Sequence, residues 1–279
     1  MASEGGIALV DLDEQGVDRA FRADVLDGLG YEQKAIPARW LYDEAGSQLF
    51  EDITQIPEYY PTRAETEILT RRGAEFAEAI GKDRAVVEFG SGSSVKTPLL
   101  LNAINPAAYV PLDISGDFLR QAADDLSAKF PGLPVYPIEA DFMREVDLPR
   151  AVHSLPKLGF FPGSTIGNMV PRTAVDLLRS MRATLQADHG VQPMLLIGMD
   201  LVKDPDVLEA AYDDAGGVTA QFNLNLARRI NRELGTTTAV ITHNAPVAKL
   251  ADRVVSLADG SVISDVRNEK KLEPSELVW

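Results

Sequence analysis

The stretch Val86–Lys96 constrains the fold of this chain more than any other. Its sequence, VVEFGSGSSVK, is a short apolar run that ends in small residues, and Thr97–Ile104 (TPLLLNAI) continues with helical character. This order predicts a strand, a glycine-rich turn and a helix. Gly90 and Gly92 lack a Cβ, so the backbone can take φ > 0 and a ligand can approach it closely. The amides of the following helix end would face that ligand, although Gly-x-Gly alone is also common in plain tight turns.

Acidic residues end the next two apolar runs. Ala107–Leu112 is followed by Asp113, about 20 residues after the glycine turn, where nucleotide-binding βαβ units place the acid that binds ribose hydroxyls. Val135–Ala140 is followed by Asp141 and Phe142, an acid and a ring suited to the edge and the face of adenine. Neighbouring strand ends of this kind would form a nucleoside pocket. The alternative interpretation is that both acids are helix N-caps.

A phosphate loop is a rival interpretation of the glycine turn. Residues 90–97, GSGSSVKT, resemble the pattern G-x-x-x-x-G-K-[ST], but Val95 stands where the second glycine belongs. That glycine lets the loop wrap a triphosphate, and a β-branched valine resists φ > 0. An ATP-binding protein therefore remains the less favoured alternative.

The composition excludes several classes of protein. A net charge of -15 over 279 residues argues against a nucleic-acid surface, and no apolar run approaches the length of a membrane span. The N-terminal MASEGGIALVDLDEQ carries acids where a signal peptide has a basic region. There is no cysteine, and the three histidines lie far apart in sequence. We expect a cytoplasmic monomer without a metal, which acts on a small molecule and has no nucleic-acid or membrane partner.

Alternating strand and helix patterns predict an α/β fold with a mostly parallel, doubly wound sheet. The later strands are expected at Leu158–Phe161 and Met194–Met199. The polar loop Pro162–Asn168 follows the first of these, at the edge where open α/β sheets carry active-site loops. Thr62 and Glu65 have the spacing of a capping box. The other expected helices are Val17–Leu29, Thr62–Arg72 with a second short helix up to Gly81, Gly116–Lys129, Pro171–Leu185, Asp206–Ala211 and Val218–Leu234.

The segment Ile36–Tyr60 is dense in aromatic residues. One interpretation is an N-terminal lid that packs on the core through Trp40, Leu41 and Phe50. The other is that Tyr42, Tyr59 and Tyr60 present hydroxyls to a small polar ligand while their rings pack. Composition alone does not separate the two.

Several long motifs resemble those of the histidine-specific N-alpha-methyltransferases. They are YYPTRAETEIL, EFGSGSSVKTPLLL, YVPLDIS, FFPGSTIGN, GMDLVKD and AAYDDAGGVTAQFNLNLARRINRELG, in that order, between about Ala38 and Gly235. The family uses S-adenosylmethionine to trimethylate histidine to hercynine, the first step of ergothioneine biosynthesis. The resemblance implies a Rossmann-like methyltransferase domain at 62–200. A smaller α+β substrate-binding or lid domain would comprise 1–61 and 201–279.

The resemblance also implies residue roles. Gly90 and Lys96 would line the amino-acid end of S-adenosylmethionine and Asp113 its ribose, while Asp141 and Phe142 would hold adenine. The substrate side would consist of Tyr42 near the methyl-transfer site, Gly163 between cofactor and substrate, and Tyr59, Asn168 and Tyr212 on the amino and carboxylate groups of histidine. Tyr42, Tyr59 and Asn168 are thus the candidate catalytic residues. A non-catalytic S-adenosylmethionine binder is the alternative.

Residues 236–263, TTTAVITHNAPVAKLADRVVSLADGSVI, depart from this pattern. They resemble the end of an ABC-transporter ATPase of the lipoprotein- or macrolide-exporter kind, in which a strand ends in Thr-His and a hairpin follows Ala-Asp-Arg-Val. The histidine that matches His243 senses the γ-phosphate there, a role that needs a complete phosphate loop in the same chain. We interpret His243 as vestigial or structural. The replaced segment leaves open whether recognition of the imidazole is altered or impaired.

Overall fold

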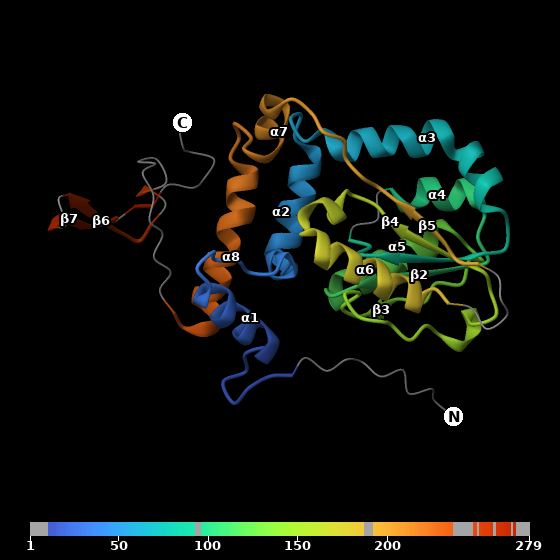
Figure 1. Ribbon diagram of the computed structural model, residues 1–279, viewed down its shortest axis with the longest axis horizontal. Coiled ribbons are helices and arrows are strands. Elements are labelled where there is room, and N and C mark those ends of the chain that lie inside the picture. Colours follow the sequence, from blue (N-terminus) through green and yellow to red (C-terminus); the bar gives the residue numbers. More distant parts are fainter. Residues whose placement is uncertain are drawn as a thin grey trace. The chain divides into compact units, whose positions relative to one another are not determined.

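The computed structural model describes residues 11–92, 96–186, 192–236, 248–249, 251–258, 261–268 and 270–271. They form two compact units, one of residues 60–202 and one of residues 11–59 together with those from 203 onward (Figure 1). The roles expected for the two domains, cofactor binding in one and substrate binding in the other, stay predictions.

A five-stranded parallel sheet forms the centre of residues 60–202, in the order β3-β2-β1-β4-β5. Its strands are β1 (Ala85–Phe89), β2 (Ala108–Asp113), β3 (Ile138–Glu139), β4 (Lys157–Phe161) and β5 (Met194–Ile197). The strand order reverses between β1 and β4. The turns that follow these two strands therefore lie at a topological switch point, where open α/β sheets bind ligands.

Helices cover both faces of this sheet (Figure 1). Side chains of alternate strand residues, such as Val86 and Leu158, pack on α3 (Tyr60–Ile80), α4 (Thr97–Ile104) and α5 (Gly116–Lys129). Residues of the opposite face, such as Val87 and Phe161, pack on α6 (Pro171–Thr184). Burial on both faces explains why the strands are continuous apolar runs. The predicted doubly wound, Rossmann-like α/β fold is confirmed.

Helix α3 differs from its prediction. It is one helix of 21 residues, not two, because Gly73 is a packing residue: a Cβ there would lie 3.2 Å from the Cβ of Ala103 on α4. The capping box is also wrong, since the helix begins at Tyr60 and Thr62 lies inside it. The carboxylate of Glu65 binds groups outside the helix.

Strand β3 is shorter than the predicted Val135–Ala140. Val135 forms only an isolated bridge with Tyr109, and the strand proper comprises Ile138–Glu139. Pro137 lies between them and has no N–H to donate to the neighbouring strand. The prediction followed the apolar run across the proline.

The second unit is mainly helical, with one antiparallel hairpin. Its elements are α1 (Arg19–Gly30), the 3-10 helix η1 (Ala38–Leu41), α2 (Glu44–Gln55), α7 (Pro205–Tyr212), α8 (Val218–Leu234), and the hairpin strands β6 (Arg253–Ala258) and β7 (Ser261–Arg267). The hairpin is largely formed by residues of the segment 236–263, but His243 lies outside the described residues. Within the described residues, no helix combines the length and the apolar character that crossing a bilayer requires.

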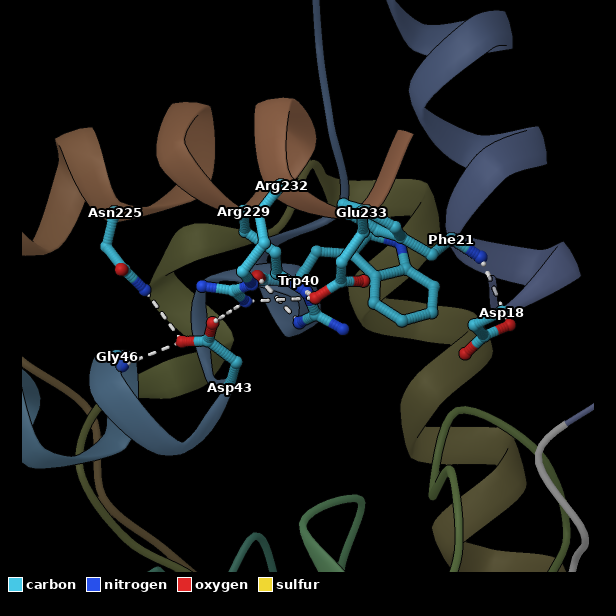
Figure 2. Close-up of polar contacts among 9 residues, drawn as sticks. All are labelled: Asp18, Phe21, Trp40, Asp43, Gly46, Asn225, Arg229, Arg232 and Glu233. Atoms are coloured by element: carbon cyan, nitrogen blue, oxygen red, sulfur yellow. Dashed lines mark hydrogen bonds and ion pairs between the residues drawn. The ribbon is translucent and has the colours of Figure 1, made fainter. Parts of the chain in front are cut away.

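Trp40 is the centre of the contacts between α1, η1 and α8. Its ring is 7% exposed and meets Phe21 edge-on at 5.1 Å. The guanidinium of Arg229 lies over both rings, 4.5 Å from the centroid of Phe21 and 5.2 Å from that of Trp40. The indole N–H donates to Asp24 at 2.8 Å. Figure 2 shows Arg229 and Glu233, an ion pair of α8, beside the indole.

Asp43 ties α2 to α8 (Figure 2). It accepts hydrogen bonds from the Gly46 amide at 2.8 Å, the Asn225 amide at 2.7 Å and the Arg232 guanidinium at 2.9 Å. Burial acts to raise the pKa of Asp43, but these donors outweigh it and hold the pKa below its usual value. The first turn of α2 is therefore anchored by a carboxylate that stays ionised.

Candidate functional site

The glycine turn follows β1 as predicted. Gly90 and Gly92 have φ of +75° and +47°, a region that other residues avoid. The amides of Gly90 and Ser91 donate to the carbonyl of Leu112 at 2.9 and 3.1 Å, so the turn folds onto the end of β2. Among the described residues, no atom lies within 4 Å of the point where a Cβ of Gly92 would stand.

Asp113 lies directly beside this turn. Its carboxylate accepts the amide of Gly92 at 3.1 Å and that of Ser115 at 3.0 Å. It is not the N-cap of α5, which is Ser115. A carboxylate has about four acceptor positions, so Asp113 can hold the turn and still accept further hydroxyl groups. This geometry suits the ribose contact that the sequence predicts, and that role stays a prediction.

Asp141 and Phe142 follow β3 at the same edge of the sheet. The amide of Ala140 donates to the carbonyl of Asp113 at 2.9 Å, and Asp141 accepts the amide of Met143. Asp141 is not a helix N-cap, because the residues directly after it form turns and not an α-helix. The ring of Phe142 packs edge-on against Phe89 and Phe161. The expected adenine contact is untested.

The Phe142 ring also lies beneath the glycine turn. A Cβ on Gly90 would lie 3.4 Å from it. Gly90, Asp113 and Asp141 thus occupy neighbouring strand ends, as the sequence predicts.

Glu88 is a residue that the sequence analysis missed. It is 1% exposed, and its carboxylate accepts the hydroxyl of Thr97 at 2.7 and 2.9 Å and that of Tyr109 at 2.5 Å. Burial raises the pKa of Glu88 to about 7, although the bonds from Tyr109 and Thr97 oppose the rise. Glu88 thereby joins β1, β2 and the first residue of α4 directly behind the glycine turn.

The raised pKa of Glu88 makes stability depend on pH. The native state holds the Glu88 proton more tightly than the unfolded chain, in which the pKa of this carboxyl is near 4.5. The free energy of unfolding therefore falls as the pH rises through about 7. We expect the Glu88 carboxyl to remove about 3 kcal/mol of stability between about pH 5 and about pH 8. Glu88→Gln, which cannot ionise, should lack this part of the decline in urea titrations at both pH values. An equal decline in variant and parent would contradict the assignment.

Lys96 and Glu65 form a half-buried ion pair at the start of α4. The Lys96 ammonium lies 2.5 Å from a carboxylate oxygen of Glu65, and each side chain is 17% exposed. Glu65 also accepts the amide of Gly163 at 2.9 and 3.0 Å. The sequence predicts Lys96 as a cofactor ligand, and the structure places it between the glycine turn and the Gly163 loop.

The loop after β4 has an unusual backbone. Gly163 and Ser164 have φ of +85° and +57°, and the 3-10 helix η3 (Thr165–Asn168) follows. The hydroxyl of Ser164 accepts the amide of Asp200, whose carboxylate accepts the hydroxyl of Tyr60. The Tyr60 hydroxyl thus donates within this unit, and the interpretation in which it also meets a ligand stays a prediction. Asn168, at the end of η3, is exposed.

The predicted tyrosines Tyr42, Tyr59 and Tyr212 belong to the other unit and form one aromatic cluster there. Tyr42 meets Phe50 and Phe222 edge-on, at 5.6 and 5.4 Å. Tyr59 is buried and meets the half-exposed ring of Tyr212 at 5.9 Å. The rings of the aromatic segment pack, as both of its interpretations expect. That these tyrosines and Asn168 hold one amino acid stays a prediction.

The comparisons with known proteins decide the family. The model of the S-adenosylmethionine-dependent, histidine-specific methyltransferases matches residues 21–251. The chain belongs to this family. The match extends beyond the span of 38–235 expected from the motifs, and it includes residues 236–251, where the sequence analysis expected the family pattern to have ended.

Curated relatives of this methyltransferase-family chain carry related names. A histidine N-alpha-methyltransferase of Mycolicibacterium smegmatis is 44% identical over 219 residues, which cover 77% of this chain and 66% of the relative. That of Mycobacterium tuberculosis is 42% identical over 228 residues, 80% of this chain and 68% of the relative. Ergothioneine biosynthesis protein 1 of Neurospora crassa is 33% identical over 73% of this chain and 23% of its own length. The chain thus spans about two thirds of the first two relatives.

Proposed function

We propose that the chain transfers methyl groups from S-adenosylmethionine to the α-amine of L-histidine, the reaction that forms hercynine in ergothioneine biosynthesis. The observation that carries the proposal is the meeting of the glycine turn, Asp113 and Asp141 at one edge of the sheet in a member of this family. The two relatives named as histidine N-alpha-methyltransferases support the choice of histidine.

The residues of this edge fit the cofactor. Gly92 has no Cβ to hold a ligand away from the turn, Asp113 can accept ribose hydroxyls, and the Lys96 ammonium supplies a positive charge for a carboxylate. When bound, S-adenosylmethionine supplies an electrophilic methyl group on a sulfonium. The chain contributes position, because an in-line displacement gains most from holding the attacking atom in a near-attack geometry.

The proposed substrate residues suit a neutral amine as the attacking group. Asn168, Tyr59 and Tyr212 would hold the amino and carboxylate groups of histidine. Gly163 would lie between cofactor and substrate, and Tyr42 near the transferred methyl. Amide and phenol groups fix the nitrogen lone pair without placing a strong acid against it. No covalent nucleophile is required, and the chain has no cysteine.

Two measurements on the whole chain test the proposal. Calorimetry with S-adenosylhomocysteine should give a binding isotherm, and no heat from the folded protein would reject the cofactor assignment. Mass spectrometry after incubation with S-adenosylmethionine and L-histidine should detect mono- to trimethylated histidine. Binding without methylated products would favour the alternative of a non-catalytic binder. The family match and the relatives do not favour a phosphate-loop ATPase.

We also propose that the protein is cytoplasmic and monomeric and binds no nucleic acid. The likeness of residues 236–263 to the end of an ABC-transporter ATPase is likewise part of the proposal. The acidic net charge supports the absence of a nucleic-acid partner. Size-exclusion chromatography with light scattering should give the mass of one chain, 30.3 kDa. Twice that mass would contradict the monomer.

A further inference from the structure

We propose that Glu65 is a positioning residue for methyl transfer, which sets the position of Lys96 and of the Gly163 loop together; this inference rests on the proposed function. Glu65 lies on α3, outside the turns that follow the strands, and no role was predicted for it beyond capping its own helix. Its carboxylate instead joins the two loops at the switch point of the sheet.

Three strand ends converge on this carboxylate. One oxygen lies 2.5 Å from the Lys96 ammonium, after β1, and both oxygens accept the Gly163 amide, after β4. The residue after β5, Gly198, must be glycine for the carboxylate to fit, because a Cβ there would lie 2.0 Å from the Glu65 Oε1 atom. The Glu65 carboxylate is therefore fixed in position by its contacts with Lys96 and Gly163 and by the space that Gly198 leaves for it.

The chemistry of the contacts makes Glu65 difficult to replace. Both bonds involve an ionised group, and such bonds are shorter and about twice as strong as neutral ones. Glu65 and Lys96 are each only 17% exposed, so water screens the pair weakly. Without the carboxylate, the Lys96 ammonium and the Gly163 amide would both lose their partner. The ammonium has three donors, and Glu65 takes one while orienting the others.

The consequence is a coupling between the two sides of the reaction. Under the proposed function, Lys96 binds the cofactor and Gly163 lies in the loop between cofactor and substrate. Because one carboxylate holds both, a change at Glu65 should affect cofactor affinity and histidine recognition together. A purely structural contact would change the melting temperature and leave these two quantities alone.

The test compares Glu65→Gln with Glu67→Gln. The glutamine keeps the size and one acceptor oxygen of Glu65 but removes its charge. We expect its Kd for S-adenosylhomocysteine and its KM for histidine to rise at least about tenfold, as loss of a hydrogen bond to a charged group implies. Glu67 lies on the same helix and pairs with Arg71 in solvent, so Glu67→Gln should leave both quantities and the melting temperature unchanged.

A double-mutant cycle shows whether Glu65 acts through Lys96. In the Lys96→Met background, Glu65→Gln should change the Kd for S-adenosylhomocysteine by less than about twofold. A full tenfold loss of affinity for S-adenosylhomocysteine in that background, or no loss of affinity in the parent background, would overturn the inference. If Glu65→Gln does not fold, Gly198→Ala provides the second test. Its methyl group must displace the Glu65 carboxylate and should reproduce the rise in both constants.

These outcomes are separate from those for the proposed function. If the unaltered chain binds no S-adenosylhomocysteine, the proposed function fails. If the unaltered chain binds it and methylates histidine while Glu65→Gln and Gly198→Ala behave as the parent does, only the role of Glu65 fails.

Discussion

Replacing Asn168 by alanine is expected to reduce methyl transfer to histidine at least about a hundredfold, while the Kd for S-adenosylhomocysteine stays unchanged. Asn168 ends η3 in the loop after β4, at the carboxyl edge of the sheet, and its side chain is exposed. The backbone before it is held by the bonds from Gly163 to Glu65 and from Asp200 to Ser164. Alanine should therefore leave the loop in place and remove only the amide that orients the substrate amine.

The measurement is kcat/KM for histidine, followed by product mass, together with calorimetry for the cofactor product. Asn102 is the matched control, because it is also an exposed asparagine of this unit, on α4. Asn102→Ala should leave both measurements as they are. A kcat/KM of Asn168→Ala within about twofold of the parent value would show that Asn168 is not part of the site. Removing a group that positions a reacting atom should lower kcat/KM by much more than that.

Local sequence patterns predict the sheet side of this site well. Residues 86–104 predict a strand, a turn and a helix because burial of a parallel strand requires a continuous apolar run and the turn requires glycine. The acids Asp113 and Asp141 follow later strands, and parallel strands bring their carboxyl ends to one edge. Their proximity to Gly90 and Gly92 thus follows from topology alone.

Long-range partners explain what the sequence did not predict. Glu65 fits a local capping box, but its carboxylate binds Lys96 and Gly163, which are 31 and 98 residues away. Glu88 looks like one polar residue in an apolar strand. Its partner Tyr109 becomes evident only when β1 and β2 pair, and its partner Thr97 only when the start of α4 packs behind β1. The helix predicted to end at Arg72 likewise continues through Gly73, where α3 packs closely against Ala103 of α4. Such cases depend on tertiary contacts, which no local spacing contains.

Trp40→Ala is expected to destabilise the unit of residues 11–59 and 203 onward by about 3–5 kcal/mol, the usual cost of removing a buried large aromatic side chain. The indole packs against Phe21 and the Arg229 guanidinium, and its N–H donates to Asp24. Alanine would remove the contacts of the indole with Phe21 on α1 and with Arg229 on α8. It would also leave the Asp24 carboxylate without one of its hydrogen-bond donors. A cavity of this size closes only in part, so most of the cost should persist.

Urea unfolding measures the loss of stability, and native-state hydrogen exchange shows in which helices it occurs. Slowly exchanging amides of α1 and α8 should lose protection in Trp40→Ala, while those of β1 and β4 in the other unit keep theirs. Trp40→Phe, which keeps a ring but not the bond to Asp24, should cost less than alanine. Tyr31→Ala removes an aromatic ring that is exposed, just after α1, and should change stability by less than about 0.5 kcal/mol. Equal losses in Trp40→Ala and Tyr31→Ala would show that the indole is not the centre of this packing, because only a buried ring leaves a cavity when it is removed.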